Sequence, residues 1–171
     1  GDMQMVQLWV NLPAKDKMSE PKYQAITNNM MAKYQLENNS GFIEVISGNY
    51  KDAKGPAFTF TPINLMNAKL YKGGKADFSF PAEYNTGLLV IEGEIKVNEL
   101  DIAPQDNFVL FENTGEDFTL EAISDSIVLV MSGEPINEPI ASQGPFVMNT
   151  RDELMQAFND FYNGKFGYLE D

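Results

Sequence analysis

The chain of 171 residues contains no histidine and no cysteine. Without histidine it has no imidazole base and lacks the ligand that iron, nickel, copper and zinc sites most often use. Without cysteine it forms no disulfide and offers no thiolate to a metal. A Ser-His-Asp triad is therefore excluded. Any metal site would depend on carboxylates, which favour hard ions.

Basic residues and long apolar runs are also scarce. Lys and Arg number 12 against 25 Asp and Glu, which gives a net charge of −13. This balance argues against nucleic acid as a direct partner, because phosphate binding needs clustered Lys and Arg, and an acidic surface is more simply a solubility feature. No apolar run approaches the about 20 residues that a membrane-spanning helix needs, and no signal-like segment opens the chain. We therefore expect a cytoplasmic protein without a membrane partner.

What the sequence does contain is a series of short alternating segments between Gly74 and Ala122. Apolar and polar residues alternate there, and turn residues interrupt them at Gly87, Gly93, Pro104 and Gly115. Period-two runs with turns about every eight to twelve positions predict the antiparallel strands of a sandwich or barrel. Further strands are expected at 6–12, 42–46, 67–71 and 127–132. A hydrophobic content of 43% is typical of a packed globular protein.

The glycine spacing in this series matches the frame of the first cupin motif. Counted from Gly74 to Gly93, the frame places Phe80, Ala82 and Thr86 where two histidines and a glutamate would bind a metal. The stretch therefore resembles a cupin-type double-stranded β-helix, a jelly-roll barrel, that lacks its metal ligands.

The last part of the chain changes in character. Residues 134–146 are rich in Pro and Gly and are expected to run extended over the surface. Thr150 and Glu153 then form a capping box, and Gly164 is placed to end a helix. Between them, apolar residues recur at helical spacing: Leu154, Ala157, Phe158, Phe161 and Tyr162. The pattern predicts one amphipathic helix of about three turns, with an apolar stripe that needs a covering surface.

Three strings, in this order, resemble the pirin family of two-domain cupin proteins: QLWVNLPAKDKMSEPKYQ near the start, VISG at 45–48, and GEPINEPIASQGPFVMNT before the helix. The resemblance covers nearly the whole chain, but only the C-terminal half of a pirin. It implies a mainly β cupin fold in three parts. These are an N-terminal strand arm at 1–20, a metal-free barrel at 21–133, and an extended segment with the C-terminal helix at 134–171.

The resemblance also carries expectations about function. In that family the N-terminal cupin domain binds a metal, usually iron, through three histidines and a glutamate that have no counterpart here. The second cupin motif aligns in two frames, with Val109 or Phe118 in its histidine position, and neither frame offers a ligand. The resemblance therefore implies a non-catalytic structural or interaction domain without a cofactor. Two alternatives stay open, namely part of a quercetin-type dioxygenase whose active domain lies upstream, and a small-molecule-binding cupin.

Three sets of residues are candidates for function. Glu92 and Glu94 share a strand face beside an expected hairpin tip and are most simply a solvated strand end. An aromatic barrel mouth would hold a flat apolar ligand, although such rings are mostly core; its members are Phe78, Phe80, Tyr84, Phe108 and Phe118. An interface with a second copy of the chain, as a homodimer, or with the missing N-terminal cupin half would use Leu8, Trp9, Val10, Leu154, Phe158 and Phe161.

Overall fold

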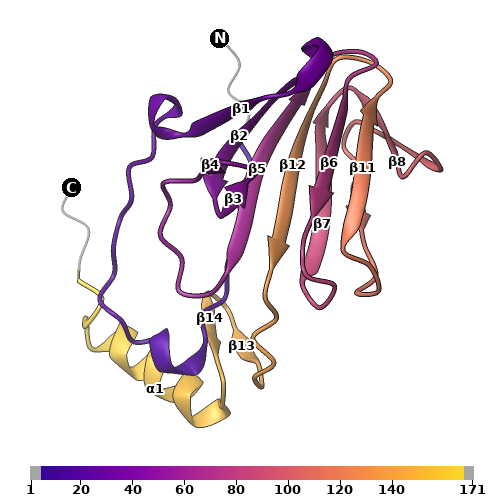
Figure 1. Ribbon diagram of the computed structural model, residues 1–171. Helices are drawn as coiled ribbons and strands as arrows, with labels where there is room; N and C mark the ends of the chain where they lie inside the picture. Colours follow the sequence, from indigo (N-terminus) through magenta and orange to yellow (C-terminus); the bar gives the residue numbers. More distant parts are fainter. Residues whose placement is uncertain (1–4, 168–171) are drawn as a thin grey trace. The chain divides into compact units, whose positions relative to one another are not determined.

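The computed structural model describes residues 5–167 and shows a mainly β protein with one α-helix (Figure 1). The predicted fold class, a mainly β cupin-type jelly roll with a C-terminal helix, is confirmed. The chain forms two compact units. The smaller unit combines the two ends of the chain, up to residue 21 and from residue 136, and the larger unit comprises residues 22–135.

The larger unit is built from two antiparallel sheets, with a short hairpin of β3 (Asn49–Tyr50) and β4 (Ala53–Lys54) beside them. The six-stranded sheet has the order β1 (Ala32–Gln35), β2 (Gly41–Ser47), β5 (Ile63–Leu70), β12 (Ser126–Gly133), β7 (Asn85–Glu92) and β10 (Phe108–Leu110). The four-stranded sheet has the order β6 (Lys75–Ser79), β11 (Asp117–Ala122), β8 (Glu94–Val97) and β9 (Asp101–Pro104). No ladder joins the two sheets within residues 5–167, so the jelly roll is an open sandwich rather than a closed barrel.

Period-two alternation decides which side chains form the core between the sheets. On β5, Met66 and Ala68 are fully buried, and on β12 the same holds for Val128 and Val130. Leu120 of β11 meets them from the other sheet in the same buried cluster. Because successive residues of a strand point to opposite faces, the residues between these positions lie on the outer side of the sheet.

Gly93 passes the chain from one sheet to the other. β7 ends at Glu92 and β8 begins at Glu94, so the single residue between them makes the corner. Its φ is 82°, and a Cβ at this position would overlap the carbonyl oxygen of Asp125, which only glycine avoids. Glu92 and Glu94 therefore belong to different sheets, and the expected hairpin tip with paired carboxylates is not formed.

The smaller unit contains the predicted helix, α1 (Arg151–Tyr162). Its capping box is confirmed, because the Thr150 hydroxyl accepts from the Glu153 amide at 3.2 Å and the Glu153 carboxylate accepts from the Thr150 amide at 2.8 Å. Gly164 follows the C-cap residue with a φ of 72°. No helix in the described part of the chain is long and apolar enough to cross a membrane.

The segment before the helix was expected to be extended, but it forms a hairpin of β13 (Ala141–Gln143) and β14 (Phe146–Met148). Its loop is Gly144-Pro145, and Gly144 has a φ of 56°. Glycine at the first position of a two-residue loop is typical of a hairpin turn. The sequence signal for this turn was therefore present in the Gly-Pro pair.

The predicted N-terminal strand is not formed. Residues 5–13 carry no strand, and the only regular element near them is a short 3-10 turn, η1 (Ala14–Asp16). The alternation at 6–12 suits a strand, but a strand also needs a neighbour to complete its hydrogen bonds. Within the described residues none pairs with this segment, and residues 5–10 are exposed.

A buried ion-pair network lies on the outer side of the six-stranded sheet. Glu44 is only 1% exposed and pairs with Lys33 at 2.9 Å and with Lys69 at 3.0 Å. The Asn28 amide donates to the same carboxylate at 3.0 Å, and both lysine Nζ atoms lie 5.5 Å from the centre of the Phe42 ring. Burial alone would raise the pKa of Glu44, but the hydrogen bonds from the two lysines and Asn28 outweigh it and lower the pKa from 4.5 to about 2.

This network predicts acid sensitivity. Because the pKa of Glu44 is lower in the folded than in the unfolded state, its carboxylate stabilises the fold above about pH 5, and this contribution is lost as the pH falls towards 2. The difference between the two pKa values corresponds to roughly 3 kcal/mol. We expect Glu44→Gln to lower the free energy of unfolding at pH 7 by about 2–3 kcal/mol and to flatten its dependence on pH between 5 and 2.5.

Urea unfolding across this pH range measures the effect, with Glu99→Gln as the control. Glu99 also faces a lysine, Lys75, at 3.6 Å, but is largely exposed, so its substitution should change stability by less than about 1 kcal/mol. Equal pH dependence in the wild-type chain and in Glu44→Gln would contradict the assignment.

Candidate functional site

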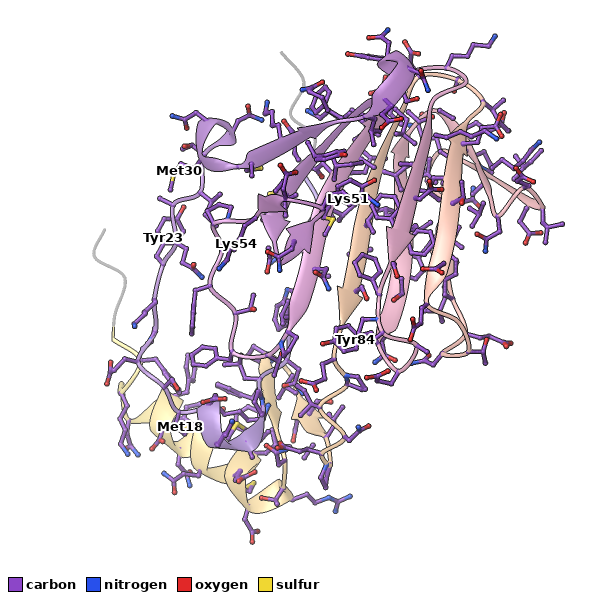
Figure 2. The ribbon with its side chains drawn as sticks, in the orientation of Figure 1. Met18, Tyr23, Met30, Lys51, Lys54 and Tyr84 are labelled. Carbon is purple, nitrogen blue, oxygen red and sulfur yellow. The ribbon has the colours of Figure 1, made fainter. Side chains whose placement is uncertain are left out.

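One end of the larger unit is filled with aromatic rings between the two sheets. Phe78 and Phe118 stand opposite each other in the β6–β11 ladder, and their rings stack at 5.1 Å with an interplanar angle of 13°. Phe80 lies 6.0 Å and Phe111 4.5 Å from the Phe118 ring, measured between ring centres. Figure 2 labels Tyr84 at the same end, in the loop that joins β6 to β7. These residues form the aromatic end of the sandwich.

Four of the five residues predicted for an aromatic pocket lie at this end, and Phe108 does not. Phe108 pairs with Leu89 on the outer side of the sheet and is 58% exposed, whereas Val109 faces the core. The prediction assigned the alternation of β10 one residue out of phase. It therefore placed Phe108 instead of Val109 on the inner face. Phe111 takes the expected place, and its spacing of two from Val109 was the signal for it. That these residues bind a ligand stays a prediction.

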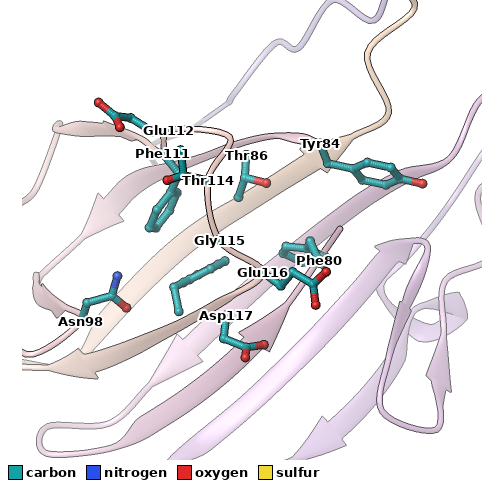
Figure 3. Close-up of a pocket in the computed structure, with 11 residues that line it drawn as sticks. Phe80, Tyr84, Thr86, Asn98, Phe111, Glu112, Thr114, Gly115, Glu116 and Asp117 are labelled. Carbon is teal, nitrogen blue, oxygen red and sulfur yellow. The ribbon is translucent and has the colours of Figure 1, made fainter. Parts of the chain in front are cut away.

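A cavity of about 170 Å³ opens at the aromatic end, beneath the loop that joins β10 to β11 (Figure 3). Its lining includes the rings of Phe80, Phe111 and Phe118, together with Tyr84, Thr86 and Glu116. The Thr86 hydroxyl is hydrogen bonded to that of Ser132 at 2.8 Å. A wider cavity of about 520 Å³ also involves Phe80 and Tyr84. The aromatic rings thus line both hollows.

Nearby acidic side chains affect the pKa of Tyr84 at the aromatic end. Burial, and then the negative charges of Glu134 and Glu83, raise the pKa of Tyr84. The phenol therefore remains a neutral hydroxyl at physiological pH and is available as a hydrogen-bond donor.

The three positions of the first cupin motif do not fit a metal. Phe80 is buried among the other rings, the Thr86 hydroxyl is already paired with Ser132, and Ala82 has no donor atom. Among the described residues, no group of three acidic or otherwise metal-binding side chains comes together. Cupin metal chemistry needs nitrogen or carboxylate donors that converge on one point, and this domain does not supply them there.

The predicted interface residues divide into exposed and packed ones. The three N-terminal members are exposed: Leu8, Trp9 and Val10. On the helix, Leu154 is buried and Phe158 packs edge to face on Phe146 of β14 at 5.0 Å, while Phe161 stays exposed. Phe158 is therefore covered by the hairpin of its own chain, and Leu154 is buried as well. That the exposed members contact a partner stays a prediction.

The comparisons with known proteins agree with this architecture. Residues 65–167 match the family model of the pirin C-terminal cupin domain. A crystal structure of quercetin 2,3-dioxygenase from Acinetobacter baumannii is similar to this chain with 42% sequence identity and a TM-score of 0.89, over 95% of this chain and 56% of that one.

Two further relatives are likewise matched over little more than half of their own length. A Pseudomonas aeruginosa protein named as a candidate quercetin 2,3-dioxygenase is 37% identical over 97% of this chain and 58% of its own length. Human pirin is 33% identical over 95% of this chain and 57% of its own length. The chain thus spans less than two thirds of the length of these three relatives.

The donor chemistry of the cupin motif leads to a direct prediction. Incubated with ferrous or nickel ions and then separated from free metal, the chain should retain far less than one ion per molecule, because hydroxyl, methyl and phenyl groups replace the ligands. Elemental analysis of the protein peak measures this. One iron or nickel ion per chain, held through gel filtration, would show that a metal site exists outside the expected positions.

Proposed function

This chain belongs to the pirin family, and we propose that it serves as the non-catalytic cupin half of a two-domain protein of the quercetin 2,3-dioxygenase type. The observation that supports the proposal is the aromatic packing at the positions of the cupin motif. Where a metal-binding cupin needs converging donors, this domain has the packed ring of Phe80 and the already bonded hydroxyl of Thr86. The domain then contributes a surface rather than an active site.

The relatives give this half a place beside a second domain. The 166 residues that match the Pseudomonas aeruginosa protein make up 58% of it, so its unmatched 42% amounts to roughly 120 residues, the size of a typical domain. In the pirin resemblance that part is the metal-binding cupin. In our proposal, such a second domain carries out the dioxygenase reaction. This chain packs against that domain and stabilises it.

The surface for this role is the outer side of the six-stranded sheet. The register makes its apolar residues neighbours: Leu129 lies opposite Leu89, which lies opposite Phe108. Phe108 and Leu110 are 58% and 72% exposed. We name as the outer-sheet patch a group of six among the outward apolar residues of β5, β12, β7 and β10: Leu65, Leu129, Met131, Leu89, Phe108 and Leu110. Sheets that are apolar on both faces are covered on both faces.

The patch has a polar border on the same sheet face. In the ladder, Leu129 is followed on β5 by Asn67 and then on β2 by Glu44, which is paired with Lys33 and Lys69. Covering an apolar side chain such as Phe108 contributes roughly 1.5–3 kcal/mol. We propose that a second cupin domain covers the outer-sheet patch by packing one of its own sheets against it.

Without that second domain, the chain should cover the patch with a second copy of itself. We expect light scattering to show a dimer at micromolar concentration, and Leu110→Lys to give a monomer because it places a charge in the patch. The matched control is Leu100→Lys, since Leu100 is 80% exposed but lies outside the patch; it should stay dimeric. A wild-type monomer, or a dimer that Leu110→Lys leaves intact, would contradict the proposed surface.

The catalytic part of the proposal has its own test. Supplied with ferrous or nickel ions and quercetin, the isolated chain should consume oxygen no faster than the protein-free mixture, because it has neither a histidine base nor a set of metal donors. An oxygen electrode measures the rate. Turnover that survives repurification and rises with protein concentration would show that the domain itself is an enzyme.

A further inference from the structure

The cavity of about 170 Å³ at the aromatic end is a feature that a supporting domain does not require. Of the acidic residues that line it, Glu116 is positioned by the strand register. The Phe80 amide donates to the Glu116 carbonyl at 2.9 Å, which extends the β6–β11 ladder by one pair beyond Ser79 and Asp117. Paired residues share a sheet face. Glu116 therefore lies on the face of the inward Phe80, and Asp117 lies on the outer face with Ser79.

Three rings from separate segments surround the inner part of the cavity. Phe80 follows β6, Phe118 belongs to β11, and Phe111 follows β10. The Phe111 amide donates to the Thr86 carbonyl at 3.1 Å, so the ring continues the inward face of the six-stranded sheet. In the close-up, Phe80 and Glu116 lie at one side of the cavity and Phe111 at the other (Figure 3). The result is a cavity lined by aromatic rings, with three carboxylates at its border, those of Glu112, Glu116 and Asp117.

The loop that carries Glu116 is fixed in place. The Asn113 side-chain amide donates to the carbonyl oxygens of Glu83 and Tyr84 at 3.0 and 3.2 Å, and to the Asn85 side chain at 3.2 Å. These bonds join the β10–β11 loop to the β6–β7 loop. A loop backbone that is already restrained loses little further freedom when a ligand binds, and this favours recognition.

Size and charge select the ligand. Drug-sized ligands occupy cavities of about 300–1,000 Å³, so a cavity of about 170 Å³ admits a small group and not a flavonol. Among the described residues that line it, none is Lys or Arg, and Glu112 and Asp117 also border it. An anion is therefore repelled, whereas a cation is attracted both by the carboxylate and by the faces of the rings.

We propose that this cavity is a binding site for a small organic cation of the alkylammonium class. The ammonium group lies in the cavity against the rings of Phe80 and Phe111, and Glu116, on the inner face of the strand pair, supplies the counter-charge. The site is independent of the proposed role in a two-domain protein, because every residue that carries it lies on the inner side of the sandwich.

Choline chloride and its neutral isostere 3,3-dimethylbutan-1-ol are the probes. The two molecules have the same shape and differ in the charge of one central atom. Titrated into the wild-type chain and followed by calorimetry or by amide NMR shifts, choline should bind with a dissociation constant below about 10 mM. The neutral isostere should bind at least about tenfold more weakly, equivalent to 1.4 kcal/mol.

Variants measure separately how the carboxylate and the aromatic rings contribute to choline binding. Glu116→Gln should weaken choline binding about fivefold or more and leave the binding of the isostere unchanged, because only the cation meets the carboxylate. The matched control is Glu121→Gln, because Glu121 lies on the outer face of β11 and does not line the cavity; it should change neither affinity by more than about twofold. Phe111→Leu keeps apolar bulk and removes the ring, so it should also weaken choline selectively.

Thermal unfolding of each variant confirms that it is folded before its binding is read. Equal affinity of the wild-type chain for both probes would show an apolar hollow without cation recognition. Choline binding that Glu116→Gln leaves intact would place the cation elsewhere on the acidic surface. The absence of choline binding below about 10 mM would also overturn the proposal.

Discussion

The six-stranded sheet is apolar on both faces, and the rest of the structure depends on how these two faces are buried. The inner face packs on the four-stranded sheet through fully buried residues such as Met66, Val128 and Val130. The outer face carries Leu129, which is also buried, and the exposed Phe108. On that same face Glu44 needs two lysines to remain ionised, since burial without partners would raise its pKa. The outer face is thus only partly covered. This explains why it carries both the buried ion pairs of Glu44 and exposed apolar side chains such as Phe108.

Aromatic packing occupies the Phe80 position of the first cupin motif at the open end of the sandwich. A ring that fills the position of a ligand adds buried area and stacking, worth about 0.5–1.5 kcal/mol per aromatic pair beyond burial. The stack of Phe78 on Phe118 is such a pair. The rings do not fill the end completely, and the loop held by Asn113 keeps a small hollow open above them. This end of the sandwich therefore combines packed rings with a small cavity bordered by acidic residues.

Much of the fold followed from local signals, and the errors have physical causes. The strands around Gly93 and the helix after Thr150 were predicted because alternation and capping act over a few residues. The segment at 6–12 alternates equally well but forms no strand, since pairing requires a neighbour that the pattern does not encode. Phe108 was assigned to the wrong face because a change of phase by one residue exchanges the two sides of a strand.

The short strand β10 serves both proposed surfaces because its residues alternate. Phe108 and Leu110 point outward into the patch, and Val109 and the following Phe111 point inward to the core and the cavity. A partner on the outer-sheet patch and a cation in the cavity would then lie on opposite sides of one sheet and would not compete for space. Each side chain of β10 points to only one face of the sheet. A substitution in this strand should therefore affect either the outer-sheet patch or the cavity, but not both.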